Sequence, residues 1–134
     1  MTKVFGIVFV SLFVLFVSSC NSSEKLLCRS WHLVDAEFDE ATVHITKEQK
    51  PQMIKQLKDS CLFTFNKDHS YVSKLPQRIE KGTWSYNKKC DTLYTQNDHT
   101  GAASKINVLS NIALDMDIHS KDGVQMKFVL APVQ

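Results

Sequence analysis

Short stretches of alternating hydrophobic and polar residues recur along most of the chain. In the last of them, Met126 and Phe128 alternate with Gln125 and Lys127. Alternation of this kind predicts β-strands that turn one face to the core and the other to solvent. Residues that favour turns, such as Asn, Asp and Gly, separate the stretches. We predict strands at residues 31–38, 61–65, 70–75, 79–86, 90–95, 104–110, 112–119 and 124–130.

The first predicted strand has four residues of one parity that we expect to share a face. They are His32, Val34, Ala36 and Phe38. The acidic Asp35 and Glu37 have the opposite parity, which places them on the other face of the strand.

One segment has helical spacing instead. Met53, Ile54 and Leu57 fall on one narrow stripe among Lys, Gln and Asp residues. Pro51 is tolerated only in the first turn of a helix, because proline lacks a backbone N–H donor. We therefore predict a helix over residues 51–59, covering or plugging one end of the strand domain.

About eight consecutive strands joined by hairpin-length loops leave two sheet edges to be protected. Closure into a barrel removes both edges. The sequence therefore predicts an all-β fold, an antiparallel up-and-down barrel of about eight strands with one short helix after the first strand. An open sandwich is the alternative. Eight strands enclose an interior that side chains can fill or that can hold one small ligand.

The N-terminal 19 residues differ from the rest. Lys3 is their only charge, and residues 4–17 are almost wholly apolar. At about 1.5 Å per residue, a 14-residue helix is roughly 21 Å long, too short for a hydrocarbon core of about 30 Å. We predict a signal peptide over residues 1–19, with an uncleaved membrane anchor as the alternative.

The remaining 115 residues are about 39% apolar, a proportion typical of a folded domain. Without Lys3 the formal net charge falls from +2 to +1. A balance this close to neutral argues against a nucleic-acid partner, since such proteins have a basic excess.

The end of the leader, Val17-Ser18-Ser19-Cys20, resembles the lipobox of bacterial lipoproteins. This resemblance implies that Cys20 carries a diacylglycerol and anchors the protein to a membrane. Residues 20–25 would then be the lipidated cysteine with a polar tether, and residues 26–134 the folded domain. The alternative is a secretory leader cut nearby, with Asn21-Ser22-Ser23 as a glycosylation sequon in a eukaryotic host.

Lipidation of Cys20 leaves Cys28, Cys61 and Cys90 in an oxidising compartment. No C-x-x-C spacing occurs, so neither a zinc ribbon nor a thioredoxin-like site is indicated. Cys61 and Cys90 both begin predicted strands, and we favour a disulfide between them. The alternative is that all three are reduced and buried.

A family resemblance rests on the order of several motifs. An early tryptophan strand, Arg29-Ser30-Trp31-His32-Leu33, precedes the helical insertion. The hairpin from Leu62 to Tyr71, the strand Lys81-Gly82-Thr83-Trp84-Ser85-Tyr86 and an alternating C-terminal hairpin follow. Together, over residues 26–131, they look like the lipocalin-like domain of many lipid-anchored proteins of Gram-negative envelopes. The resemblance implies a barrel located in the bacterial cell envelope, at the outer membrane rather than the inner.

Candidate chemistry is sparse. Asp115, Asp117 and His119 share one strand face and could ligate Zn²⁺ or Ca²⁺. The alternating Leu114 and Met116 are better suited to the core, so we expect the acidic face to be solvated and predict no metal site. Neither a G-x-S-x-G nor an H-E-x-x-H motif is present. We therefore expect no catalytic residues, no cofactor and no enzymatic activity.

Aromatic residues are spread over several predicted strands and are the best candidates to line a ligand cavity. These are Trp31, Phe63, Phe65, Tyr71, Trp84, Tyr86, Tyr94 and Phe128. Gly82 shares its parity with Trp84 and would leave room beside a neighbouring ring. A filled core is the alternative, because a small domain needs most of its aromatic residues for packing.

These features favour an anchored, non-catalytic module that binds a small apolar ligand in its barrel. The alternative is a structural or interaction subunit with a filled barrel, which contacts an envelope protein through its outer face or the helix at 51–59. A small hydrolase or metal-dependent enzyme is a third, weaker hypothesis. A cavity of roughly 300 Å³ or more would distinguish the first from the second.

Overall fold

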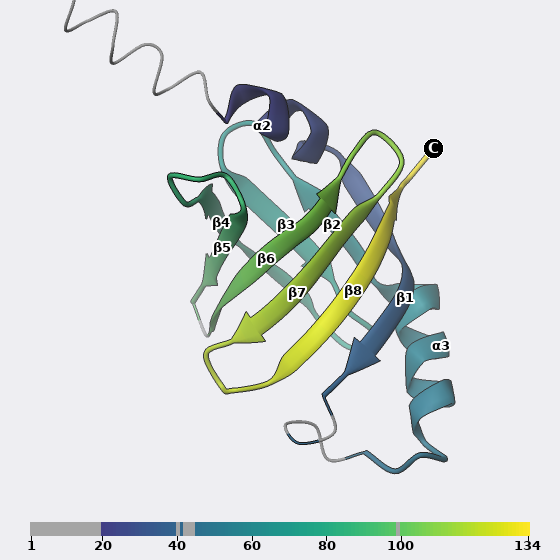
Figure 1. The fold of residues 1–134 in the computed structure, drawn as a ribbon. Coiled ribbons are helices and arrows are strands. Elements are labelled where there is room, and N and C mark those ends of the chain that lie inside the picture. Colours follow the sequence, from purple (N-terminus) through teal and green to yellow (C-terminus); the bar gives the residue numbers. More distant parts are fainter. Residues whose placement is uncertain (1–19, 40, 42–44, 99) are drawn as a thin grey trace, which may run out of the picture.

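Eight antiparallel strands form a closed barrel in the protein (Figure 1). The structure is a computed structural model and describes residues 20–39, 41, 45–98 and 100–134. Each strand pairs with its neighbour in sequence, and β1 closes the barrel by pairing with β8. The predicted antiparallel up-and-down barrel is therefore confirmed. The predicted signal helix over residues 1–19 lies outside the described residues.

The elements follow one another along the chain with short connections. They are α2 (Asn21–Leu27), β1 (Ser30–Phe38), α3 (Lys50–Ser60), β2 (Leu62–Phe65), β3 (Ser70–Lys74), β4 (Ile79–Tyr86), β5 (Thr92–Asn97), β6 (Gly101–Leu109), β7 (Leu114–Ser120) and β8 (Gln125–Pro132). The predicted helix after the first strand is confirmed as α3, with Pro51 in its first turn, as its missing N–H donor requires. Among the described residues, no helix has the length and hydropathy needed to cross a bilayer.

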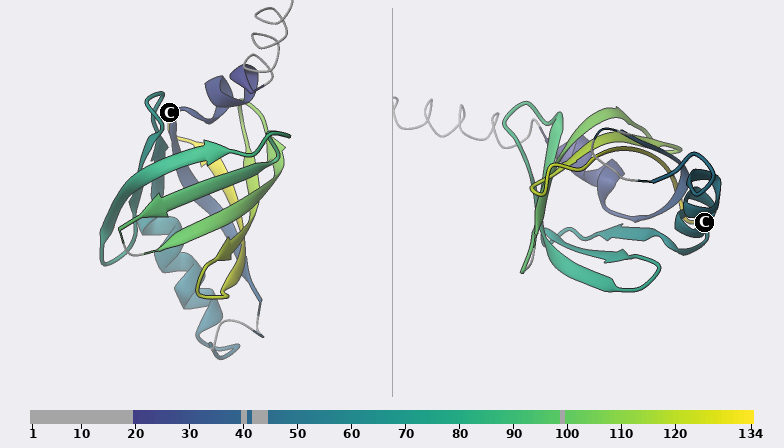
Figure 2. Two further views of the ribbon diagram at one scale, coloured as in Figure 1. Left: turned by 90° about the vertical axis from the view of Figure 1, so that its left-hand side faces the viewer. Right: turned by 90° about the horizontal axis from the view of Figure 1, so that it is seen from below.

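Connections in an antiparallel barrel alternate between its two ends. The turns β2–β3, β4–β5 and β6–β7 lie at the end where α2 sits, and the other connections lie at the opposite end (Figure 1). Helix α3 packs against β1 near that opposite end, as the two further views show (Figure 2). The two ends are therefore built from different elements.

The α2 end is closed by packed side chains. Leu27 and Trp31 have no exposed surface, and Trp84 is 2% exposed. The indole N–H of Trp31 donates to the carbonyl oxygen of Leu27 at 3.0 Å, which fixes the end of α2 over the barrel. Full burial of a leucine side chain contributes about 1.5–3 kcal/mol. Helix α2 is therefore a plug, and we call this the closed end.

Residues 20–25 were predicted to form a polar tether, but Asn21–Leu27 form helix α2. Two hydrophobic residues shortly after the polar run explain the difference. Leu27 is fully buried, and Cys28 packs against the core. Burial of this end holds the polar residues before it close to the barrel.

The predicted parity of the first strand is only half correct. Trp31 and Leu33 face the core, whereas His32 and Val34 are exposed. A register shift between Leu33 and Asp35, where β1 pairs with β8, moves the following residues to the opposite face. Ala36 and Phe38 are therefore buried as predicted. A β-bulge of this kind inserts one residue and cannot be seen in simple alternation.

Two predicted boundaries also differ. The strand expected at residues 90–95 is β5, from Thr92 to Asn97, so Cys90 lies in the preceding turn with a φ of 60°. The strand expected to begin at residue 104 is β6, which begins at Gly101. The connection between these two strands is correspondingly shorter than predicted.

Candidate functional site

A cavity of about 300 Å³ occupies the half of the barrel away from α2. Its outer lining residues come from the ends of strands at that side, including Phe38, Leu75 and Ser120, so we call this side the mouth. The lining residues are Phe38, Met53, Leu57, Phe63, Phe65, Tyr71, Ser73, Leu75, Arg78, Glu80, Leu93, Thr95, Asn97, Thr100, Gly101, Ala102, Ser104, Met116, Ile118, Ser120, Met126 and Phe128. The volume is at the lower end of the range for sites that bind small molecules.

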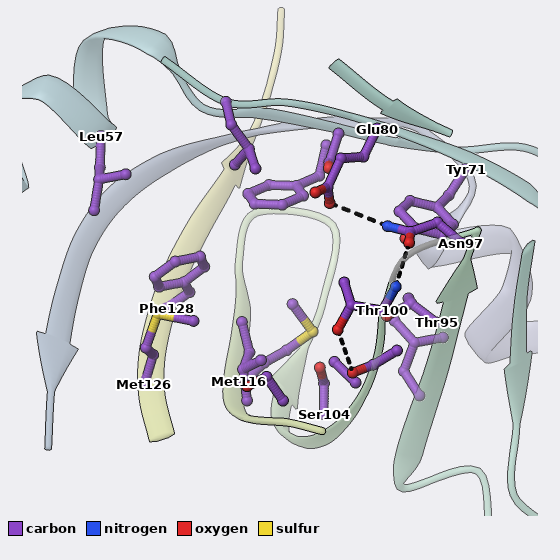
Figure 3. A pocket seen from close by; sticks show the side chains of 18 of the residues that line it. Leu57, Tyr71, Glu80, Thr95, Asn97, Thr100, Ser104, Met116, Met126 and Phe128 are labelled. Atoms are coloured by element: carbon purple, nitrogen blue, oxygen red, sulfur yellow. Dashed lines mark hydrogen bonds between the residues drawn. The ribbon is translucent and has the colours of Figure 1, made fainter. Parts of the chain in front are cut away.

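One side of the cavity is apolar. Strands β1, β2, β7 and β8 and helix α3 supply it, and Figure 3 shows Met116, Met126 and Phe128 there. The rings of Phe63 and Phe128 lie 6.0 Å apart, centroid to centroid. Methionine side chains adapt to irregular shapes and make favourable contacts with aromatic rings. This side, which we call the apolar wall, can therefore adapt to hydrophobic ligands of different shapes.

The opposite side, supplied by β3 to β6, contains a hydrogen-bonded cluster. Asn97 donates through Nδ2 to Glu80 Oε2 at 3.2 Å, and the backbone N–H of Thr100 donates to Asn97 Oδ1 at 2.7 Å (Figure 3). The Tyr71 side chain lies beside this pair, with the polar side chains of Asn97 and Thr95 next to its hydroxyl. These five residues form what we call the polar wall.

Tyr71 owes its position to a glycine on the neighbouring strand. Tyr71 pairs with Gly82, and a Cβ atom at Gly82 would lie 2.8 Å from a carbon of the Tyr71 ring. The same atom would lie 2.1 Å from the carbonyl oxygen of Gln96. Gly82 thus gives the ring the room that the sequence suggested. Burial raises the pKa of Tyr71, so its hydroxyl stays protonated over the physiological range.

The predicted aromatic residues divide between the two ends. Phe63, Phe65, Tyr71 and Phe128 line the cavity. Trp31, Trp84 and Tyr86 belong to the packed closed end, where Trp84 meets the Tyr86 ring edge-on at 81°. Tyr94 does not line the cavity, because it lies on the outer face of β5 and is 47% exposed. Its neighbours Leu93 and Thr95 have the inward parity of that strand.

Sequence reasoning missed the polar residues of the site. Glu80 shares the inward parity of Gly82 and Trp84 on β4, and Asn97 shares that of Leu93 on β5. Charged and amide side chains at inward positions of a barrel strand are unusual, because burial of polar groups costs free energy. A polar residue at an inward-facing strand position was therefore the signal in the sequence that could have identified these site residues.

The cysteine pairing differs from the prediction. Cys90 forms a disulfide with Cys20, not with Cys61. Cys61 is buried and reduced after α3, and burial raises its pKa. The predicted pair depended on both cysteines beginning strands, but Cys90 lies in the β4–β5 turn at the closed end, beside Cys20. The same sulfur atom of Cys20 cannot carry both this disulfide and a lipid thioether.

The acidic residues of β7 lie on the face opposite the buried one. Leu114 and Met116 are buried, while Asp115 lies 4.0 Å from Lys127 Nζ on the neighbouring strand. Within the described part of the chain, no three His, Cys, Asp or Glu side chains are grouped as metal ligands.

The fold and the cavity define a class: small eight-stranded antiparallel barrels with an interior site open at one end. The chain is similar in structure to a DUF4847 family protein from Bacteroides vulgatus. The TM-score is 0.52 at 14% identity, and the match covers 83% of this chain and 96% of that one. At this identity the likeness concerns the fold alone. No family model and no curated protein matches the sequence.

Proposed function

We propose that the protein is a non-catalytic binding module that holds a small, mostly apolar molecule in its barrel. The cavity of about 300 Å³ carries this proposal. It is open at one end and closed at the other by the α2 plug. A concave, largely apolar site with a few fixed polar groups is typical of small-molecule binding.

Two further features support binding without catalysis. Among the described residues that line the cavity there is no histidine, cysteine or lysine that could act as a nucleophile or base. Glu80, a carboxylate of the lining, is engaged by Asn97 and by Arg78, whose Nε lies 2.9 Å from Glu80 Oε1. The alternative of a purely structural subunit assumed a filled barrel, and the hollow interior weighs against it.

A fluorescent probe tests the binding function directly. N-phenyl-1-naphthylamine is apolar and gains fluorescence when it leaves water. We expect saturable binding in the micromolar range, about −8 kcal/mol. Ala102→Phe would fill the cavity, because Ala102 pairs with the inward-facing Thr95 and lines the site. We expect this variant to lose binding at least about tenfold.

Ala103→Phe is the matched control. Ala103 is the next residue along β6 and pairs with the exposed Tyr94, so its side chain lies on the outer face. It should bind the probe as the unchanged protein does. Circular dichroism melts would establish that both variants are folded. Absence of saturable binding to the unchanged protein, or equal binding by Ala102→Phe, would refute the proposal.

We also propose that the module works in the bacterial cell envelope, anchored to a membrane through a lipid on Cys20. The lipobox-like sequence before Cys20 supports this. So does the position of Cys20 at the closed end, since anchorage there leaves the mouth directed away from the bilayer. Anchorage requires Cys90 to be free, whereas a soluble product would have the Cys20–Cys90 disulfide.

The mass of the envelope form separates these states. An N-terminal peptide that begins at Cys20 with an added diacylglyceryl group, absent in Cys20→Ala, would support anchorage. Non-reducing peptide mapping that finds Cys20 bonded to Cys90 would contradict it. Cys61→Ser is the control, because its thiol takes part in neither state.

A further inference from the structure

The polar groups of the cavity are gathered on one side. Of the polar side chains that the structure describes in the lining, only Ser120 comes from outside β3–β6 and the turns between them. The methionine and phenylalanine side chains lie on the opposite side. A uniformly apolar ligand would leave the polar wall without partners, and burial of unpaired polar groups is costly. The division therefore suggests a ligand that is itself divided into an apolar and a polar part.

Glu80 and Arg78 form an ion pair at the polar wall, and both side chains line the cavity. The Glu80 side chain is 17% exposed, whereas the side chain of Arg78, its ion-pair partner, is 68% exposed. The carboxylate of Glu80 is therefore the more buried of the two charged groups, and the guanidinium of Arg78 is the more exposed. A group that enters the cavity meets the carboxylate of Glu80 at the polar wall.

Glu80 retains the capacity to accept further hydrogen bonds. Asn97 Nδ2 bonds one of its oxygens, and Arg78 Nε the other. A carboxylate has about four lone-pair sites, so each oxygen can accept another donor. The bond from the Thr100 N–H holds Asn97 in place, and Asn97 in turn orients Glu80 (Figure 3). The wall is therefore organised before any ligand enters.

We propose that the ligand is a small amphiphile whose head group donates hydrogen bonds to Glu80, as a hydroxyl, amide or ammonium group does, and that carboxylate head groups are rejected. Its apolar part lies against Met116, Met126 and Phe128. This inference rests on the proposed binding function and adds the chemical class of the ligand. Rejection follows because a second carboxylate at Glu80 would be a like charge with no proton to share.

Three probes with the same ten-carbon chain test the inference: decanol, decylamine and decanoate. Each would compete with N-phenyl-1-naphthylamine at neutral pH, below its micelle concentration. We expect decanol and decylamine to displace the dye at least about tenfold more effectively than decanoate, since hydrogen bonds to charged groups contribute about 1.5–3 kcal/mol. This comparison uses the unchanged protein and needs no variant.

Glu80→Gln tests the role of the carboxylate. An amide has nearly the same shape but no charge, and it can donate to a carboxylate. We expect decanoate to bind within about threefold of decanol in this variant, and decylamine to lose most of its advantage. Glu37→Gln, on the exposed face of β1, is the matched control and should keep the preferences of the unchanged protein.

The outcomes separate the two proposals. Dye binding combined with equal displacement by all three probes would overturn the head-group inference and leave the binding function intact. Tighter binding of decanoate, or an unaltered preference in a folded Glu80→Gln, would do the same. No dye binding at all would overturn the binding function and this inference with it.

Discussion

The two ends of the barrel use similar aromatic residues for opposite purposes. At the closed end, Trp31 and Trp84 fill the interior beneath Leu27 of α2. At the mouth, Phe63 and Phe128 surround a cavity. The difference begins with the covering elements, because the α2 residue Leu27 is fully buried, whereas α3 packs against β1 and lines the cavity with Met53 and Leu57.

The size of the inward-facing side chains also differs between the two ends. Inward positions of β3, β5 and β6 near the mouth hold small residues, among them Ser73, Thr95, Ala102 and Ser104. Large residues at the same positions would fill the space, as tryptophan does at the other end. A barrel of eight strands can therefore be solid in one half and hollow in the other, and the choice is made by a few inward positions.

Truncation of a large side chain at each end should give the largest contrast. Trp31→Ala would leave a void in packed surroundings and remove the hydrogen bond to Leu27. We expect it to lower the free energy of unfolding by about 3–5 kcal/mol. Met126→Ala, at the cavity, should cost less than half as much, because its surroundings are already hollow. Urea denaturation measures both.

The exposed Val34 provides a surface control, and Val34→Ala should change the free energy of unfolding by no more than about 0.5 kcal/mol. Dye affinity, measured on the folded fraction, should change only in Met126→Ala. Equal losses of stability for Trp31→Ala and Met126→Ala would mean that the two ends are equally packed.

Removing the hydroxyl from one tyrosine at each end should change the free energy of unfolding by a smaller amount, in opposite directions at the two ends. Tyr86, at the closed end, has a buried hydroxyl with no hydrogen-bond partner among the described residues, and burial raises its pKa. Tyr71, at the cavity, has the polar side chains of Asn97 and Thr95 beside its hydroxyl. We expect Tyr86→Phe to stabilise the protein by up to about 1 kcal/mol and Tyr71→Phe to destabilise it by a similar amount.

Chemical denaturation of the two variants provides the measurement. The substitution is the same, so differences in the unfolded state largely cancel. A loss of stability in Tyr86→Phe would show that its hydroxyl has a partner after all, and would place a polar contact inside the closed end.

Alternation was enough to predict the barrel, because period-two patterns and short connections leave few topologies for eight consecutive strands. It was not enough at β1, where the bulge after Leu33 reverses the parity. The α2 plug was missed for a similar reason. The polar residues before Leu27 suggest a tether, and only the folded structure shows that Leu27 is buried in the barrel. Both features depend on contacts between distant segments.

The site was predicted in part. Aromatic character and location on predicted strands identified Phe63, Phe65, Tyr71 and Phe128, which line the cavity. Their positions on the strands did not reveal which end of the barrel is hollow. Trp31, at the closed end, was therefore grouped with the cavity residues. The polar wall was missed because no role was assigned to Glu80 in the strand predicted at 79–86, and because Asn97 lay beyond the predicted end of its strand at residue 95. The partner of Cys90 depends on where a turn meets α2, and no spacing rule supplies that.

A loss of stability in acid is expected from two turns at the closed end and is the smallest effect predicted. Hydrogen bonds from Ser70 lower the pKa of Asp68 in the β2–β3 turn, and one from Asn87 lowers that of Asp91 in the β4–β5 turn. A lowered pKa in the folded state means that stability is present above the unfolded value of 3.8 and is lost as the pH falls through the folded value. Asp68→Asn should therefore reduce the loss of unfolding free energy that occurs as the pH falls into the acid range. Ser70→Ala should reduce this loss in part. If urea denaturation between neutral pH and the acid limb gives the same curve for both variants as for the unchanged protein, these turns do not stabilise the closed end.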